Sequence, residues 1–236
     1  GGGKICVVMR QHHTKLIFIE EGFRMKLFKK VLAAALAGVL ALSVLTGCNN
    51  SAATVTMVDA LNDWSKVYGV GTTFKKGDEK LQAQVNALAE IVNEAGKDIG
   101  SEDVKNLEDV YDAVMNNEAA RLKLQEWAKQ FAKANIGDGS PLYQYGFADI
   151  SLTLSAGNKN KNIYYANQLM MTSGTPINAP ETEWGHHGER NWTVGDKCYV
   201  AVATCEVGGR KYMVALFKTT AEKNPDYKPN QNPDKN

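Results

Sequence analysis

The spacing of the apolar residues changes partway along the chain, and this change limits the possible folds more than any other feature. Between residues 81 and 131, apolar side chains recur at the three- and four-residue steps of helices. Gly96 supplies a stop for a first helix, while Ser101 and Asn117 can cap a second and a third. The three stripes, which we interpret as core, are Leu81, Val85, Leu88, Val92 and Ala95; Val104, Leu107, Tyr111 and Val114; and Leu124, Trp127, Ala128 and Phe131.

The second half of the chain follows the period of strands. Ile150, Leu152 and Leu154 alternate with polar residues, which predicts a half-buried strand followed by a polar turn over residues 158–162. Two further apolar runs flank Gly208-Gly209, a strong signal for a hairpin. Helices first and an antiparallel sheet last predict an α+β fold.

Cys198 and Cys205 lie in the first strand of this predicted hairpin. Their separation of seven residues places them on opposite faces of a strand and about 23 Å apart. A disulfide requires Cα atoms within about 7 Å of each other. We therefore predict two free, buried thiols.

An apolar run near the start of the chain predicts export. Three lysines follow Met25, and Val31 to Leu45 form a 15-residue apolar segment, shorter than the roughly 20 residues of a membrane-spanning helix. Leu45-Thr46-Gly47-Cys48 resembles the lipobox of bacterial lipoproteins. The resemblance implies that Cys48 is lipidated, becomes the first mature residue and holds the protein in membrane lipid on the outer face of the cell membrane. An ordinary cleaved signal and a buried helix are the alternatives.

These features divide the chain into five parts. We interpret residues 1–24 as a non-native or miscalled leader, which sets aside Cys6, His12 and His13 as metal ligands, and residues 25–47 as a lipoprotein signal peptide. Residues 48–77 are expected to form the lipidated cysteine and a tether, residues 78–220 one domain, and residues 221–236 a disordered polar tail.

The charge of the mature chain makes nucleic acid an unlikely class of partner. From Cys48 onward there are 20 basic and 24 acidic residues, a net charge of −4. The sequence has no basic stripe with interleaved aromatic residues, so we expect no nucleic acid partner. A core of about 150 residues is the size of one domain, which is short for a two-lobed solute-binding lipoprotein.

Several short motifs occur in an order similar to that of the CAP superfamily, which includes cysteine-rich secretory proteins, antigen 5 and plant pathogenesis-related proteins. Gly185-His186-His187 falls where the family has Gly-His-Arg, and Lys161-Asn162-Ile163 where it has Glu-Asn-Ile. Glu126-Trp127-Ala128 is similar to part of its second helix, and residues 201–217 resemble its closing hairpin. The resemblance spans about residues 81–217. It implies a CAP-like α/β/α sandwich, with helices on both faces of a small antiparallel sheet.

The resemblance also implies a cavity with two histidines and two acidic residues, which in many members can hold a divalent metal. His186 matches one histidine, but Asp138 is the nearest polar residue to the position of the other. Lys161 replaces one acid and would repel a cation, and either Glu181 or Glu183 could stand in for the second. A zinc site needs at least three protein ligands, so we expect no cofactor. His186 then has three readings: a polar residue bonded within its loop, a remnant of cavity chemistry, or a metal ligand.

Three hypotheses for function follow. The first is a surface lipoprotein with a non-catalytic CAP-like domain that binds a small apolar molecule, a cell-wall component or a protein partner. Its expected ligand-binding residues are Trp184, His186, His187, Tyr164 and Tyr165, with Trp192 nearby, although plain packing also explains the aromatic residues.

The second hypothesis is a hydrolase or metal-dependent enzyme that uses a reduced cavity. It requires His186, Asp138 and Glu181 or Glu183 to converge as catalytic residues, and a lysine inside that cavity would oppose it. The third is an unrelated α+β adhesion or scaffolding domain.

Overall fold

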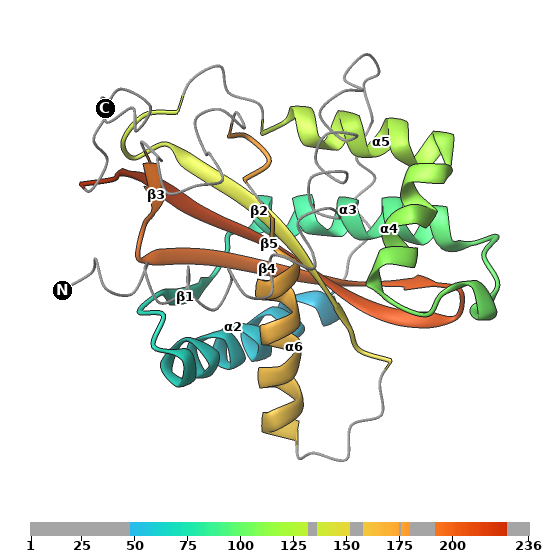
Figure 1. The fold of residues 1–236 in the computed structure, drawn as a ribbon, viewed down its shortest axis with the longest axis horizontal. Coiled ribbons are helices and arrows are strands. Elements are labelled where there is room, and N and C mark those ends of the chain that lie inside the picture. Colours follow the sequence, from blue (N-terminus) through green and yellow to red (C-terminus); the bar gives the residue numbers. More distant parts are fainter. Residues whose placement is uncertain (1–47, 132–135, 152–157, 175, 180–191, 226–236) are drawn as a thin grey trace, which may run out of the picture.

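The computed structural model describes residues 48–131, 136–151, 158–174, 176–179 and 192–225. The elements in chain order (Figure 1) are α2 (Cys48–Tyr68), β1 (Thr73–Lys76), α3 (Glu79–Gly96), the 3₁₀ helix η1 (Ser101–Asp103), α4 (Leu107–Asn116), α5 (Glu118–Lys129), β2 (Pro141–Asp149), α6 (Asn158–Thr172), β3 (Trp192–Val194), β4 (Lys197–Val207) and β5 (Arg210–Lys223).

The strands form one mixed sheet in the order β1-β4-β5-β2, with the short β3 also paired to β5. Strand β4 turns into β5 at Gly208-Gly209, as the sequence predicts, and β2 is antiparallel to β5. Both turn glycines have positive φ, 57° and 73°, which two-residue hairpin turns require. Strand β1 is parallel to β4, so the sheet is not purely antiparallel.

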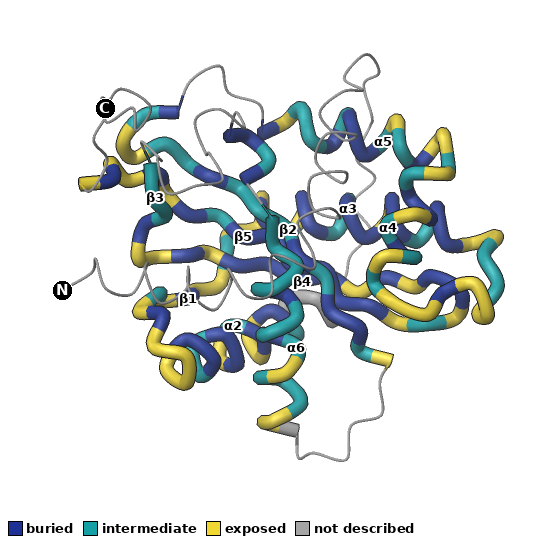
Figure 2. Tube along the Cα trace, in the orientation of Figure 1, coloured by how far each residue is buried: buried dark blue, intermediate teal, exposed yellow. Residues whose placement is uncertain are grey.

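Helices cover both faces of this sheet. One face, here the α3–α5 face, carries a core formed with α3, α4 and α5, and the opposite α2–α6 face carries a second core (Figure 1). Figure 2 shows buried residues along the central strands and on parts of α2 and α3, with exposed residues mostly at the periphery. The α+β prediction is confirmed.

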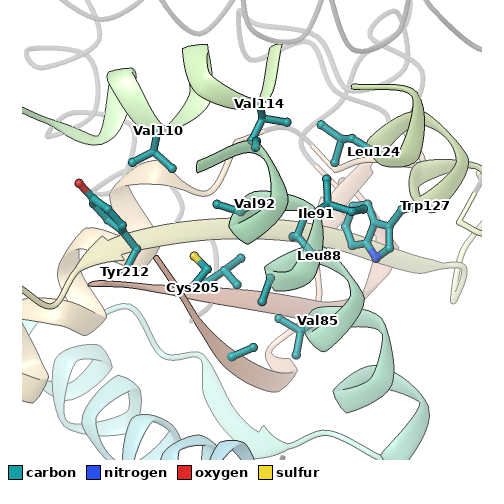
Figure 3. Close-up of a cluster of buried hydrophobic side chains, with 14 of the residues drawn as sticks. Val85, Leu88, Ile91, Val92, Val110, Val114, Leu124, Trp127, Cys205 and Tyr212 are labelled. Atoms are coloured by element: carbon teal, nitrogen blue, oxygen red, sulfur yellow. The ribbon is translucent and has the colours of Figure 1, made fainter. Parts of the chain in front are cut away.

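The two cysteines of β4 mark the two cores. Cys205 packs on the α3–α5 face in the same buried cluster as Val92 and Tyr212 (Figure 3), whereas Cys198 packs on the α2–α6 face. Both are free and buried. The prediction of unpaired thiols on opposite faces is therefore confirmed.

Helix α3 and helix α5 match their sequence patterns. Asp78 caps α3 by accepting a hydrogen bond from the Leu81 N–H at 2.7 Å, and the helix ends at Gly96. A β-carbon at Gly96 would lie 2.8 Å from the Glu206 carbonyl oxygen, so this crossing requires glycine. Asn117 caps α5 through the Ala120 N–H at 3.0 Å, as predicted.

The prediction of a cap at Ser101 is wrong. Ser101 begins η1, and α4 starts at Leu107 with Asn106 as its cap. The Asn106 side chain accepts from the Asp109 N–H, and the Asp109 carboxylate accepts from the Asn106 N–H. This reciprocal capping box satisfies more backbone groups than a serine alone can.

The strand predicted over residues 150–155 is wrong at its first two residues, because β2 ends at Asp149 and Ile150 and Ser151 belong to no strand. Tyr143, Tyr145 and Phe147 alternate along β2. Aromatic residues are enriched in strands, so their presence favours a strand at these positions. Residues 152–157 lie outside the described residues. The predicted turn over residues 158–162 is also wrong, since these residues form the start of α6.

The tether predicted for residues 48–77 is wrong as well. This segment forms α2 and β1, and Met57, Leu61 and Trp64 of α2 are buried in the α2–α6 core. The Thr54 hydroxyl accepts a hydrogen bond from the Val202 N–H at 3.0 Å. At the other end, β5 continues to Lys223, so the sheet includes the first three residues of the predicted tail. Residues 226–236 lie outside the described residues.

Side chains form hydrogen bonds with backbone groups on the outer edges of the two edge strands, β1 and β2. On β1, the Asn62 amide donates to the Phe74 carbonyl and accepts from the Phe74 N–H, both at 2.9 Å. On β2, three side-chain oxygens accept from backbone N–H groups: Asn178 from Tyr143, Thr172 from Phe147 and Gln168 from Asp149.

Candidate binding site

The residues that sequence analysis selected fall into two groups. Trp184, His186, His187, Glu181 and Glu183 lie outside the described residues, so their predicted roles stay predictions. Cys48, Asp138, Lys161, Tyr164, Tyr165 and Trp192 are described.

Asp138 helps to hold the end of the sheet. Its carboxylate accepts a hydrogen bond from the Lys223 N–H at 3.1 Å, beside an open hollow of about 480 Å³. Lys161 lies near the start of α6, which is far from this end of β5 (Figure 1). Among the described residues, no three histidine, cysteine or acidic side chains are grouped closely enough to hold a metal ion.

The described aromatic residues of the predicted cleft do not form one site. Tyr164 and Tyr165 lie side by side on α6 with ring centres 6.1 Å apart, and Tyr165 packs against the α2–α6 core. Trp192 begins β3 and packs against a separate small cluster around Leu142 and Ala221. Packing accounts for Tyr165 and Trp192.

A different set of aromatic residues comes together along β2. Tyr143, Tyr145 and Phe147 point to the α3–α5 face, where they meet Trp127 and Phe131 from the end of α5. Successive ring centres lie 4.6 Å apart for Phe131 and Tyr143, 4.9 Å for Trp127 and Phe131, 6.0 Å for Trp127 and Tyr145, and 5.8 Å for Tyr145 and Phe147. We call these five residues the aromatic row.

The position of the aromatic row follows from local structure. Alternation along β2 places its three aromatic side chains on one face. The Trp127 side chain is held against α3, because its indole Nε1–H donates a hydrogen bond to the Gln84 carbonyl oxygen at 2.8 Å. Figure 3 shows Trp127 at one end of the buried cluster that backs the row. The row therefore rests on a rigid support.

Solvent exposure differs between the two elements that form the row. Trp127 and Phe131 are buried, while Tyr143, Tyr145 and Phe147 are half-buried. Burial raises the pKa of Tyr145 to about 12 and also raises the pKa of Tyr143, which Lys80 lowers and Asp78 raises to smaller extents. Both hydroxyls are thus protonated at neutral pH, and the row offers ring faces together with neutral donors.

A second concave region lies where α2 ends and β1 begins. This open, polar hollow of about 870 Å³ includes Asn62, Asp63 and Ser65 in its lining. The Asp63 carboxylate pairs with Lys159 at 3.1 Å, and the Ser65 hydroxyl donates to the Thr72 carbonyl at 2.8 Å. These polar groups are already engaged in holding the loop and α6, so the aromatic row is the stronger candidate.

Sequence analysis missed the aromatic row, although two of its signals are visible. Tyr143, Tyr145 and Phe147 alternate, and Trp127 and Phe131 are four residues apart on one helical stripe. Their meeting requires the packing of α5 beside β2, which no local pattern specifies. Comparison of the chain with family models, with curated proteins and with solved structures finds no match.

Proposed function

We propose that this protein is a bacterial surface lipoprotein whose domain binds a cell-wall glycan through the aromatic row. The observation that carries the proposal is the row itself, with three half-buried rings on one strand and two buried rings behind them. Ring faces stack on the C–H faces of sugars, and tyrosine hydroxyls can hydrogen-bond sugar oxygens.

Binding is favoured over catalysis by the state of Asp138. The alternative of a hydrolase with a reduced cavity assigns Asp138 a catalytic role, but its carboxylate is engaged by the Lys223 N–H at the end of the sheet. Tyr143 and Tyr145 are half-buried, so part of each side chain remains accessible to a ligand.

The proposal also includes a CAP-like arrangement of the α+β domain. The helices on both faces of the sheet and the closing hairpin at Gly208-Gly209 support it. Helix α2 and the parallel strand β1 are additions to the pattern that the resemblance implies.

The aromatic row is tested by titrating the purified protein with neutral oligosaccharides of N-acetylglucosamine in calorimetry. We expect Tyr145→Ala to weaken binding by about tenfold, because it removes a stacking surface worth roughly 1 kcal/mol or more. Tyr145→Phe keeps the ring and should retain most of the affinity. Tyr68→Ala, at an exposed tyrosine on α2, is the matched control. Equal affinities for Tyr145→Ala and the native protein would refute the role of the row.

The anchor is tested separately with Cys48→Ser in a bacterial host. We expect the native protein in the membrane fraction, with an intact mass that shows acyl chains on Cys48, and the variant outside that fraction. In the described part of the chain, no helix combines the length and apolar character needed to cross a bilayer. A native protein without acyl chains would contradict the lipoprotein proposal.

A further inference from the structure

A line of alternating lysine and tyrosine side chains crosses the end of the sheet. Lys75 of β1 is paired with Tyr199 of β4, Tyr199 with Lys218 of β5, and Lys218 with Tyr143 of β2. Directly paired residues share a face of a sheet, so the four side chains form one cross-strand line on the α3–α5 face. We call them the lysine–tyrosine row.

The helix layer covers this row only in part. One step further along the same face, Ala201 and Leu216 are buried beneath α3, with relative exposures of 1% and 0%. In contrast, Lys75 is exposed, Tyr199 is 42% exposed, and Lys218 and Tyr143 are half-buried. The boundary of α3 therefore falls between the core and the row, and the end of the sheet is exposed at Lys75 and Tyr199 and partly accessible at Lys218 and Tyr143.

The row is positively charged although the mature chain is net negative. Within the described residues, neither Lys75 nor Lys218 forms an ion pair, and the exposed Lys197 extends the same face. Lys80 lies close enough to Tyr143 to lower its pKa. The nearby carboxylate of Asp78 is used by the cap of α3. The row itself thus contains two lysines and no acidic residue.

We infer that the lysine–tyrosine row binds an anionic glycan, one that carries phosphate or carboxylate groups. This inference rests on the proposed function and narrows its ligand class. Strands lie about 4.8 Å apart, so Lys75 and Lys218 are roughly 10 Å apart with the Tyr199 ring between them. Ammonium groups bind phosphate and carboxylate oxygens, and the ring between them can stack on a sugar. Tyr143 belongs to both rows, which makes them one continuous surface.

The position of the anchor distinguishes a glycan from the membrane surface as the occupant. Cys48 and Tyr68, the first and last residues of helix α2, are 20 residues apart, which at about 1.5 Å per residue is roughly 30 Å. Strand β1, with Lys75, follows the far end of α2, and the row lies on the sheet face opposite α2. A lipid on Cys48 would therefore hold the bilayer away from the row, which faces outward toward the wall.

The test uses the full-length protein in detergent and three probes: a glycerol-phosphate polymer, neutral dextran, and vesicles of phosphatidylglycerol. We expect the protein to bind the glycerol-phosphate polymer, with an affinity that falls as salt rises, and to bind dextran and vesicles at least tenfold more weakly. The double variant Lys75→Gln/Lys218→Gln should bind the polymer about tenfold more weakly and with a smaller salt dependence. The control Lys97→Gln/Lys211→Gln removes two exposed lysines elsewhere and should bind like the native protein.

Three results would overturn the inference: no binding of the polymer by the native protein, equal losses in the two double variants, or a preference for vesicles. The neutral N-acetylglucosamine titration separates this failure from that of the proposed function. If the neutral oligosaccharide still binds in a Tyr145-dependent way, only the anionic class is wrong.

Discussion

The two thiols of β4 show how strongly burial alone sets the chemistry of a residue. Cys198 and Cys205 face different cores, and burial raises the pKa of each from its ordinary value of 9.0 to about 12. Because the thiolate is the reactive form, both side chains are inert at neutral pH. Burial likewise raises the pKa of Tyr212 to about 12.

These pKa shifts predict a loss of stability in alkali. The unfolded chain releases the thiol protons near pH 9, whereas the folded chain retains them up to about pH 12. The free energy of unfolding should therefore be unaffected by these groups below pH 9 and fall between pH 9 and 12, by about 1.4 kcal/mol per thiol for each pH unit well inside that range. Urea unfolding at pH 8 and pH 10 measures the change.

Cys198→Ala/Cys205→Ala is the control for this prediction, and its stability should fall less between the two pH values. Alkylation at pH 8 followed by peptide mass spectrometry gives a second check. Rapid labelling of both cysteines in the folded protein would contradict the burial argument.

At the scale of elements, the sequence predicts those whose signals are local. Helix α3 and helix α5 each combine a cap with an apolar stripe, and the β4–β5 hairpin combines two apolar runs with a glycine pair. The sequence does not signal the start of helix α6, because residues 158–162 alternate asparagine and lysine. This polar pattern also suits a turn. Its stability comes from contacts with α2 and β2 that are distant in sequence.

Strand β1 also depends on distant contacts, and Asn62 of α2 is the one we expect to matter most. Asn62→Ala removes both hydrogen bonds to the Phe74 backbone and leaves its N–H and carbonyl without that partner. We expect the free energy of unfolding to fall by about 1–3 kcal/mol. Chemical denaturation measures it, with Asn160→Ala on the exposed side of α6 as the control. A loss no larger than that of the control would show that β1 does not need this bridge.

At the scale of the whole molecule, the error that matters most is the boundary of the domain. The apolar side chains of α2 recur at helical spacing, but the polar residues between them and the nearby lipobox-like motif favoured a tether. The candidate site shows the same limit. Each aromatic residue of the row is visible in the sequence, yet the row exists only because α5 packs beside β2 on one face of the sheet.

The boundary itself can be tested by truncation. A chain that begins at Asp78 lacks α2 and β1 and exposes Val200, Val202 and Phe217 of the α2–α6 core. We expect this chain to lack a cooperative thermal transition in circular dichroism and to be degraded rapidly by trypsin, whereas a chain that begins at residue 48 with Cys48→Ser should unfold cooperatively. A cooperative transition at the same temperature in both chains would support the interpretation of residues 48–77 as a tether that the domain does not need.

The side chains that hydrogen-bond to the sheet edges have a consequence for how molecules of this protein meet one another. An open strand edge is a template on which a second molecule can add a strand, and this is a common route to aggregation. Here Asn62 occupies the edge of β1 at Phe74, and Asn178, Thr172 and Gln168 occupy the edge of β2 at Tyr143, Phe147 and Asp149. Two molecules that meet edge to edge therefore find no free backbone ladder at these positions, and we expect them to stay separate even at the high local concentration that the proposed lipid anchor would produce.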